Sequence, residues 1–253
     1  MAIDDFFLQL VVKARNHWRE TSGRPAGARP LALALGYPDL LVDAAGLGSY
    51  LDAATIGALP VREDARQIMK WHSTGDRLAM IYDSMAVFDA LGIDMEVTDV
   101  ARHRNCERIV DLNEKLPADM EQRYDLLIDT GTLEHCFNVG QAFSNMCAAM
   151  RQHGLIVHGA PLNRYNHGFW SFNPTLYHDF FEDNGFAIRW MKGASVDAGG
   201  QTQLYDLPPF QGFADAPPRS AVLVVAQRQE VRPFRWPVQR KYRQTPAMQA
   251  QQQ

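Results

Sequence analysis

Short apolar runs recur along the chain and alternate with segments in which apolar residues repeat every three to four positions. The runs that read as buried strands lie at 31–36, 94–100, 109–117, 124–129 and 155–161. Helical spacing separates them, most clearly at 77–91 and 132–150. A strand followed by an amphipathic helix, repeated in this way, predicts a parallel sheet that is covered by helices on both faces.

The remaining segments complete this α/β architecture. A helical pattern over 2–19 precedes the first strand, and another helix is expected over 174–184. The last two strand-like runs, 186–191 and 221–227, are separated by a wide segment without helical spacing, so they should join the sheet antiparallel. We predict a Rossmann-like, doubly wound and mostly parallel sheet with an antiparallel last strand and an extra N-terminal helix.

The chain divides into three predicted regions. Residues 1–29 form the N-terminal helix and a Gly/Pro-rich connector, and residues 30–228 form the Rossmann-like domain. Within that domain, 192–220 is expected to be a loop that covers the substrate. Residues 229–253 are predicted to be a basic, mobile tail, because its arginines and lysine show no burial pattern.

Composition excludes several classes of protein. The 25 Lys and Arg against 29 Asp and Glu give a net charge of −4, which argues against a dedicated nucleic-acid binder. No apolar run is long enough to span a membrane, and the first residues do not resemble an export signal. The 3 cysteines lack the spacing of a zinc module or a disulfide framework. A cytoplasmic protein with reduced thiols is expected.

Polar residues stand where the predicted strands end. In an open parallel sheet, ligands bind beyond the carboxyl ends of the strands, near the reversal of strand order. A carboxylate after the second strand could accept both hydroxyls of a ribose, and a polar pair after the third could recognise a purine. Each aspartate is equally well explained as a turn or helix cap. The candidates are Gly36, Asp99, Asp111, Leu112, Asn113, Asp129, Thr130 and Gly131.

The segment 124–185 resembles the second half of a class I S-adenosylmethionine-dependent methyltransferase. The resemblance is most specific in DTGTLEH (129–135) and HGFWSFNP (167–174), and it extends weakly over 30–227. It is most similar to methyltransferase-like proteins of bacterial sugar and secondary-metabolite biosynthesis. The resemblance implies S-adenosylmethionine as the cofactor, held by the strand-end residues, and a small-molecule acceptor. It implies neither a membrane nor a nucleic-acid partner, and is compatible with a homodimer or a pathway partner.

The resemblance also implies that the loop after the fifth strand contacts the acceptor. We expect substrate contacts there from Asn163, Tyr165, Trp170, Phe172 and Asn173. His167 is the first candidate for the catalytic base and His135 the second, because methyl transfer to a hydroxyl or an amine requires loss of a proton. The alternatives are that Trp170 and Phe172 anchor the loop in the core, and that His135 is structural.

One departure from the family pattern keeps other functions open. The family has a glycine-rich turn after its first strand, where this chain offers only Gly36 followed by Tyr37 and Pro38. A catalytically altered relative that acts as a binding partner would account for this. A metal-dependent enzyme is a further alternative, with His135, Cys136, His158 and His167 as convergent ligands, although their spacing matches no known metal motif.

Overall fold

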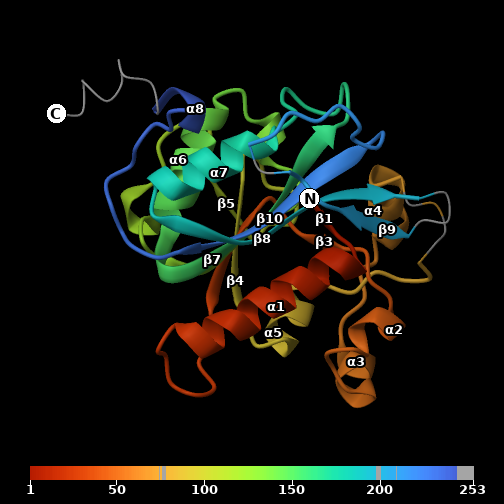
Figure 1. Ribbon diagram of the computed structural model, residues 1–253. Coiled ribbons are helices and arrows are strands. Elements are labelled where there is room, and N and C mark those ends of the chain that lie inside the picture. The colour runs from red at the N-terminus through yellow and green to blue at the C-terminus, as the bar shows by residue number, and fades with distance from the viewer. Residues whose placement is uncertain (74, 76–77, 198–200, 209, 244–253) are drawn as a thin grey trace.

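The computed structural model describes residues 1–73, 75, 78–197, 201–208 and 210–243. Its centre is an eight-stranded sheet of order β5-β4-β2-β6-β7-β10-β8-β9 (Figure 1). The strands are β2 (Leu31–Leu35), β4 (Asp94–Asp99), β5 (Glu107–Ile109), β6 (Tyr124–Asp129), β7 (Met150–Asn163), β8 (Phe186–Val196), β9 (Thr202–Tyr205) and β10 (Ser220–Arg228).

The five strands from β5 to β7 are parallel, and the last three pair antiparallel. β2 pairs with both β4 and β6, and β6 pairs with β7, all in parallel. β10 inserts between β7 and β8 and runs antiparallel to both. The order of the parallel strands is 3-2-1-4-5 in chain sequence, as in doubly wound folds. The predicted fold class is therefore confirmed.

Helices cover both faces of the sheet. Leu126 and Ile128 face the cluster that contains Leu8 of α1 (Asp5–Thr21), while Leu127 between them faces Phe143 of α6 (Val139–Ala149). This alternation follows from the two-residue period of a strand. Figure 1 shows α1 and α5 (Ser84–Ala90) on one side, and α6 and α7 (Pro174–Asp183) on the other. The apolar runs of the sequence reflect burial on both faces.

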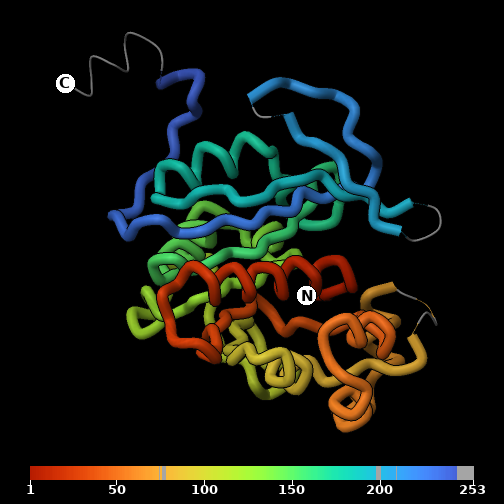
Figure 2. Tube along the Cα trace, turned by 60° about the horizontal axis from the view of Figure 1, so that its bottom comes forward, coloured from red at the N-terminus to blue at the C-terminus, as the bar shows by residue number. Residues whose placement is uncertain are grey.

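A helical insertion lies between β2 and α5. It contains β3 (Asp39–Leu40), α2 (Ala44–Leu47), α3 (Ala53–Ala58) and α4 (Ala65–Trp71). β3 pairs in parallel with β1 (Ala2–Ile3), so the chain start lies beside this insertion. Figure 2 shows the insertion gathered at one side of the molecule, next to the N-terminus.

Two predicted helices are shorter in the structure. The helix expected over 77–91 begins only at Ser84, because the Asp83 side chain accepts from Ala86 N at 3.0 Å and caps it. Residue 77 itself lies outside the described residues. The helix expected over 132–150 is divided into η2 (Leu133–His135) and α6, which has Asn138 as its N-cap.

The segments after β8 contain more regular structure than the sequence indicates. Residues 192–196 continue β8, and β9 pairs with them, so part of the predicted loop 192–220 is strand. Residues 198–200 and 209 of that segment, and 244–253 of the predicted tail, lie outside the described residues. In the described part of the tail, Arg235 exchanges backbone hydrogen bonds with the Asn184 side chain at 2.9 and 3.0 Å. α8 (Arg240–Arg243) follows, and Arg243 pairs with Asp183 at 2.7 Å.

A short 3₁₀ helix, η1 (Ala118–Met120), precedes β6. Among the described helices, none combines the length and the apolar character that crossing a membrane requires.

Candidate functional site

The order of the parallel strands reverses between β2 and β6. The chain leaves β2 toward β4 on one side, and later returns to form β6 and β7 on the other. At such a reversal, the loops after the two central strands diverge, and a crevice opens at the carboxyl edge of the sheet. The residues that follow β2, β4 and β6 therefore define the candidate site.

Gly36 shapes the turn after β2. Its φ is +89°, a left-handed conformation that favours glycine. A Cβ on Gly36 would lie 3.3 Å from Thr132 Oγ1, 3.5 Å from Met1 Cβ and 3.8 Å from Asp99 Oδ2. The loops after β2, β4 and β6 thus approach one another at this glycine. The Thr132 hydroxyl also donates to Leu35 O and ties the β6 loop to β2.

Asp99 ends β4 at the same edge. It is half-buried, and its Oδ1 accepts from Ala101 N at 3.3 Å, which leaves Oδ2 toward Gly36. Val110 N donates to Asp99 O at 2.9 Å and brings the loop after β5 alongside. The exposed Asp111 is the next strand-end carboxylate, and accepts from both nitrogens of Asn113, at 2.9 and 2.8 Å.

Leu112 and Asn113 are tied to helix α6. Asn113 Oδ1 accepts from Asn138 N at 2.8 Å, and Leu112 O accepts from Asn145 Nδ2 at 3.1 Å. The buried Asn145 also bonds Glu114 O and Leu116 N, so it shapes the whole loop after β5. Sequence reasoning missed Asn145, because a polar residue within a helical pattern gives no sign of the loop it supports.

Asp129 at the end of β6 is fully buried and fully engaged. Its Oδ1 accepts from Gly131 N and Thr132 N at 3.2 and 2.8 Å, and its Oδ2 lies 2.8 Å from His158 Nδ1. His158 Nε2 lies 2.9 Å from the Tyr177 hydroxyl of α7. Burial raises the pKa of Tyr177 well above its ordinary value, so the hydroxyl keeps its proton. Asp129 thus orders the loop beneath the site and offers no free oxygen to a ligand.

Thr130 and Gly131 form the turn after β6. The hydroxyl of Thr130 is buried and has no hydrogen-bond partner among the described residues. Its backbone N–H lies 3.1 Å from Met1 Sδ, so the side chain of Met1 lies at this edge, between the turns after β2 and β6. Gly131 has a φ of +109°, and a Cβ there would lie 2.9 Å from Glu134 Oε1.

Both predicted catalytic histidines lie together beside this turn. His167 Nε2 is 3.4 Å from Glu134 Oε1, and His135 Nε2 is 4.0 Å from the same oxygen. The two imidazole rings pack edge to face with centroids 5.3 Å apart. Burial and the nearby Asp129 raise the pKa of Glu134 to about 8. Burial lowers the pKa values of His135 and His167, which favours neutral imidazoles.

The four-residue metal hypothesis is wrong for two of its members. His158 is fully buried between Asp129 and Tyr177, and the Cys136 thiol points to Thr132 O at 3.8 Å. His135 and His167 do converge, but their third neighbour is Glu134, which the sequence reasoning did not select. The reason is physical: residues near consecutive strand ends share an edge, but the direction of each side chain depends on its own turn.

Three of the five predicted substrate residues line one cavity. Asn163, Tyr165 and Asn173 border a cavity of about 680 Å³, which is also lined by Pro208, by residues 210–214 and by Ala216. Asn163 Nδ2 donates to Ala216 O at 3.1 Å and joins the two walls. Asn173 also caps α7, since its Oδ1 accepts from Thr175 N at 3.0 Å.

The other two aromatic residues have structural contacts. Phe172 is 4% exposed and packs against Phe143, His158 and Tyr177 in the core. Trp170 Nε1 donates to Cys136 O at 3.0 Å and fastens the loop to the end of η2. These contacts fix the position of the loop that carries His167.

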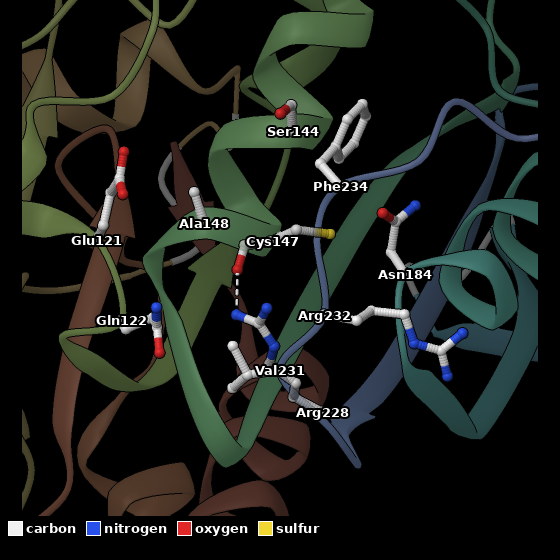
Figure 3. Close-up of a pocket in the computed structure, with 10 residues that line it drawn as sticks. All are labelled: Glu121, Gln122, Ser144, Cys147, Ala148, Asn184, Arg228, Val231, Arg232 and Phe234. Atoms are coloured by element: carbon white, nitrogen blue, oxygen red, sulfur yellow. Dashed lines mark hydrogen bonds between the residues drawn. The ribbon is translucent and has the colours of Figure 1, made fainter.

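A second cavity lies at the opposite edge of the sheet. It has a volume of about 170 Å³ and is lined by residues that precede β6 and β7, together with Arg228 and Arg232. In Figure 3, Arg228 points toward α6 and donates to Cys147 O at 2.6 Å. Its guanidinium also bonds Met150 O at 2.6 Å. This cavity faces the amino ends of the parallel strands, which is not the edge where ligands bind in such sheets.

No protein-family model matches the sequence, and no curated protein matches it either. Among solved structures, the chain is similar to the 1,6-didemethyltoxoflavin-N1-methyltransferase of Burkholderia thailandensis, determined with 1,6-didemethyltoxoflavin and S-adenosylhomocysteine. The identity is 10% and the TM-score 0.42, over 89% of this chain and 88% of that one. For the N-methyltransferase NodS of Bradyrhizobium japonicum, in complex with S-adenosylhomocysteine, the identity is 11% and the TM-score 0.39, over 88% of both chains.

A third similar structure is the DszA carbon methyltransferase, with 11% identity and a TM-score of 0.46. The match covers 91% of this chain and 55% of that one, so this chain spans about half of its length. At such identities the assignment of a function rests on the residues of this chain.

Proposed function

We propose that the protein is an S-adenosylmethionine-dependent methyltransferase of the class I type that acts on a small molecule. The observation that carries the proposal is the approach of the loops after β2, β4 and β6 at the reversal of strand order. Gly36 lies there beside Thr132 Oγ1 and Asp99 Oδ2, and Met1 lies next to both Gly36 and Thr130 N. A close-approach glycine, a carboxylate and a hydroxyl donor are the groups that a nucleoside with an amino-acid tail requires. The resemblance of 124–185 to this family supports the same conclusion.

The residues at this edge fit the cofactor in three respects. The half-buried Asp99 can accept both ribose hydroxyls, while the exposed Asp111 and its partner Asn113 border the neighbouring loop, where the base would bind. The unpartnered Thr130 hydroxyl can bond the amino-acid part. Met1 must withdraw from Thr130 N before a ligand can use that group. When bound, the cofactor supplies an electrophilic methyl group on a sulfonium.

The acceptor would enter from the cavity lined by Asn163, Tyr165 and Asn173. Its volume of about 680 Å³ lies within the range of small-molecule sites. We infer that His167 on the same loop, or His135 beside it, takes the proton from the acceptor in the metal-free protein, because burial lowers the pKa of both imidazoles and favours the neutral form that a base requires. The loop contacts of Trp170 and Phe172 would hold this base in position.

Calorimetric titration with S-adenosylmethionine tests the proposal. Asp99→Asn keeps the shape of the side chain and removes its charge, so the affinity should fall about ten- to a hundredfold. Asp94→Asn is the matched control, since Asp94 starts the same strand at its opposite end and pairs with Arg29 at 2.7 Å. Its affinity for the cofactor should equal that of the parent.

Two results would contradict the proposal. If Asp99→Asn binds as tightly as the parent, the ribose assignment is wrong. If the folded parent binds neither S-adenosylmethionine nor S-adenosylhomocysteine, the protein is not a transferase of this kind. The alternative of a catalytically altered relative that binds a partner would then be favoured.

A further inference from the structure

Glu134, His135 and His167 form a compact group of metal-ligating side chains at the carboxyl edge of the sheet. One ligand atom from each lies within 4.8 Å of the other two. Glu134 and His135 come from η2 after β6, and His167 comes from the loop after β7, so two separate segments supply them. No other group of three such side chains is found in the described part of the chain.

The distances match a coordination sphere that needs little adjustment. Two ligands bound to one ion at about 2.0 to 2.2 Å with tetrahedral angles stand roughly 3.4 Å apart. His167 Nε2 and Glu134 Oε1 are 3.4 Å apart, and His135 Nε2 is 4.0 Å from the same oxygen. The His135 side chain is 50% exposed and has room to turn toward that oxygen.

The backbone around Glu134 holds this carboxylate in place. Phe169 N donates to Glu134 O at 2.8 Å, which fixes the histidine loop against η2. A Cβ on Gly168 would lie 2.7 Å from Glu134 O, and one on Gly131 would lie 2.9 Å from Glu134 Oε1. The two glycines therefore allow a close approach that any larger residue would prevent.

Glu134 also has an unsatisfied acceptor. Its side chain is 1% exposed, and Oε2 makes no hydrogen bond within the described residues. A buried polar atom without a partner is costly, and a bound ion is one of the groups that can satisfy it.

We propose that Glu134, His135 and His167 bind one divalent transition-metal ion of the Zn²⁺ class. Two imidazole nitrogens and one carboxylate suit this class, whereas Mg²⁺ and Ca²⁺ prefer sites made only of oxygen ligands. Three protein ligands leave at least one coordination position open, as in catalytic zinc sites. His135 and His167 are both exposed, so solvent could reach a metal ion held there.

The metal site gives His167 a different role from that of a free base. In the metal-bound protein its Nε2 is a ligand, so a proton from the acceptor would have to leave by another route. The binding of the ion can be measured without cofactor or acceptor, so this proposal stands or fails independently of the transferase assignment.

The experiment is equilibrium dialysis of the metal-free chain against Zn²⁺, followed by elemental analysis. We expect one equivalent to bind to the parent. His167→Ala and Glu134→Gln each remove one ligand, and each should weaken Zn²⁺ binding by more than about a hundredfold. Loss of a residue that only hydrogen-bonds to a metal ligand already weakens binding by up to about that factor. His103→Ala, which removes an exposed histidine outside the group, should bind as the parent does.

Substitution with Co²⁺ supplies a spectroscopic test. Visible d–d absorption should appear in the parent and change in His135→Ala, where an exposed side chain is removed and the fold should be kept. No bound equivalent in the parent would overturn the proposal. Unchanged affinity in His135→Ala and in His167→Ala, or an equal loss in His103→Ala, would overturn it too.

Discussion

Asp129 on β6 and His158 on β7 are register partners, and their side chains are joined by a hydrogen bond of 2.8 Å between two fully buried groups. On the other side of the imidazole, His158 Nε2 lies 2.9 Å from the hydroxyl of Tyr177 in α7, so the three side chains form one hydrogen-bonded series. Burial of a carboxylate is costly unless its oxygens accept hydrogen bonds. The series therefore links the turn after β6, which borders the candidate site, to the helix that covers the sheet.

The first prediction compares how much the Asp129–His158 and the His158–Tyr177 hydrogen bonds contribute to stability. His158→Phe keeps an aromatic ring among Phe143, Phe172 and Tyr177, but leaves a buried oxygen of Asp129 without its partner. The free energy of unfolding should fall by about 3 kcal/mol or more. Tyr177→Phe leaves the buried Nε2 of His158 without a partner, and because this ring nitrogen is not a carboxylate oxygen the cost should be smaller, about 1 to 2 kcal/mol. Urea unfolding of both variants measures the difference, and equal losses would show that Asp129 does not depend on His158.

The same residues show what the sequence could predict. The sequence predicts Asp129 as a site residue because an apolar run, typical of a buried strand, ends there. His158 lies inside the next apolar run, and only the register of β6 against β7 makes it the partner of Asp129. Register depends on the whole sheet, so local patterns do not contain it.

Glu134 and Asn145 were missed for a related reason. Both are polar residues in helical turns, where they usually face solvent. Their burial results from the loops that fold over them: the loop with His167 covers Glu134, and the loop after β5 covers Asn145. In contrast, the convergence of His135 with His167 could be anticipated, because both follow neighbouring strands at one edge.

The second prediction concerns alkaline pH. Burial raises the pKa of the Cys147 thiol from 9.0 to about 12 in the folded protein. Above pH 9 the unfolded chain loses this proton while the folded chain keeps it, so stability falls as the pH rises toward 12. Tyr177, whose pKa is also raised by burial, adds to the fall above its ordinary value of 10.

Cys147→Ala removes the thiol contribution. In urea unfolding under reducing conditions, its free energy of unfolding should fall less steeply with pH than that of the parent from about pH 9 upward. The variant loses some packing at every pH, so the slope and not the absolute stability is compared. A slope identical to that of the parent would mean that the thiol ionises in the folded protein as easily as in the unfolded chain.

The last prediction compares the same substitution at two glycines. Gly36→Ala introduces a Cβ at a φ of +89°, 3.3 Å from Thr132 Oγ1, so it strains the turn after β2 and should cost about 1 to 3 kcal/mol. Gly57→Ala places a Cβ in open space within α3, where alanine is the better helix former, and should gain about 0.5 to 1 kcal/mol. Gly36 lies at the carboxyl edge of the sheet, where we propose that the cofactor binds. Gly36→Ala should therefore bind S-adenosylmethionine more weakly than the parent, and Gly57→Ala should bind it equally well. Urea unfolding measures the change in stability of each variant, and calorimetric titration measures its affinity for S-adenosylmethionine. A Gly36→Ala variant that is more stable than the parent and binds the cofactor as tightly would show that the loops at this edge do not approach as closely as described.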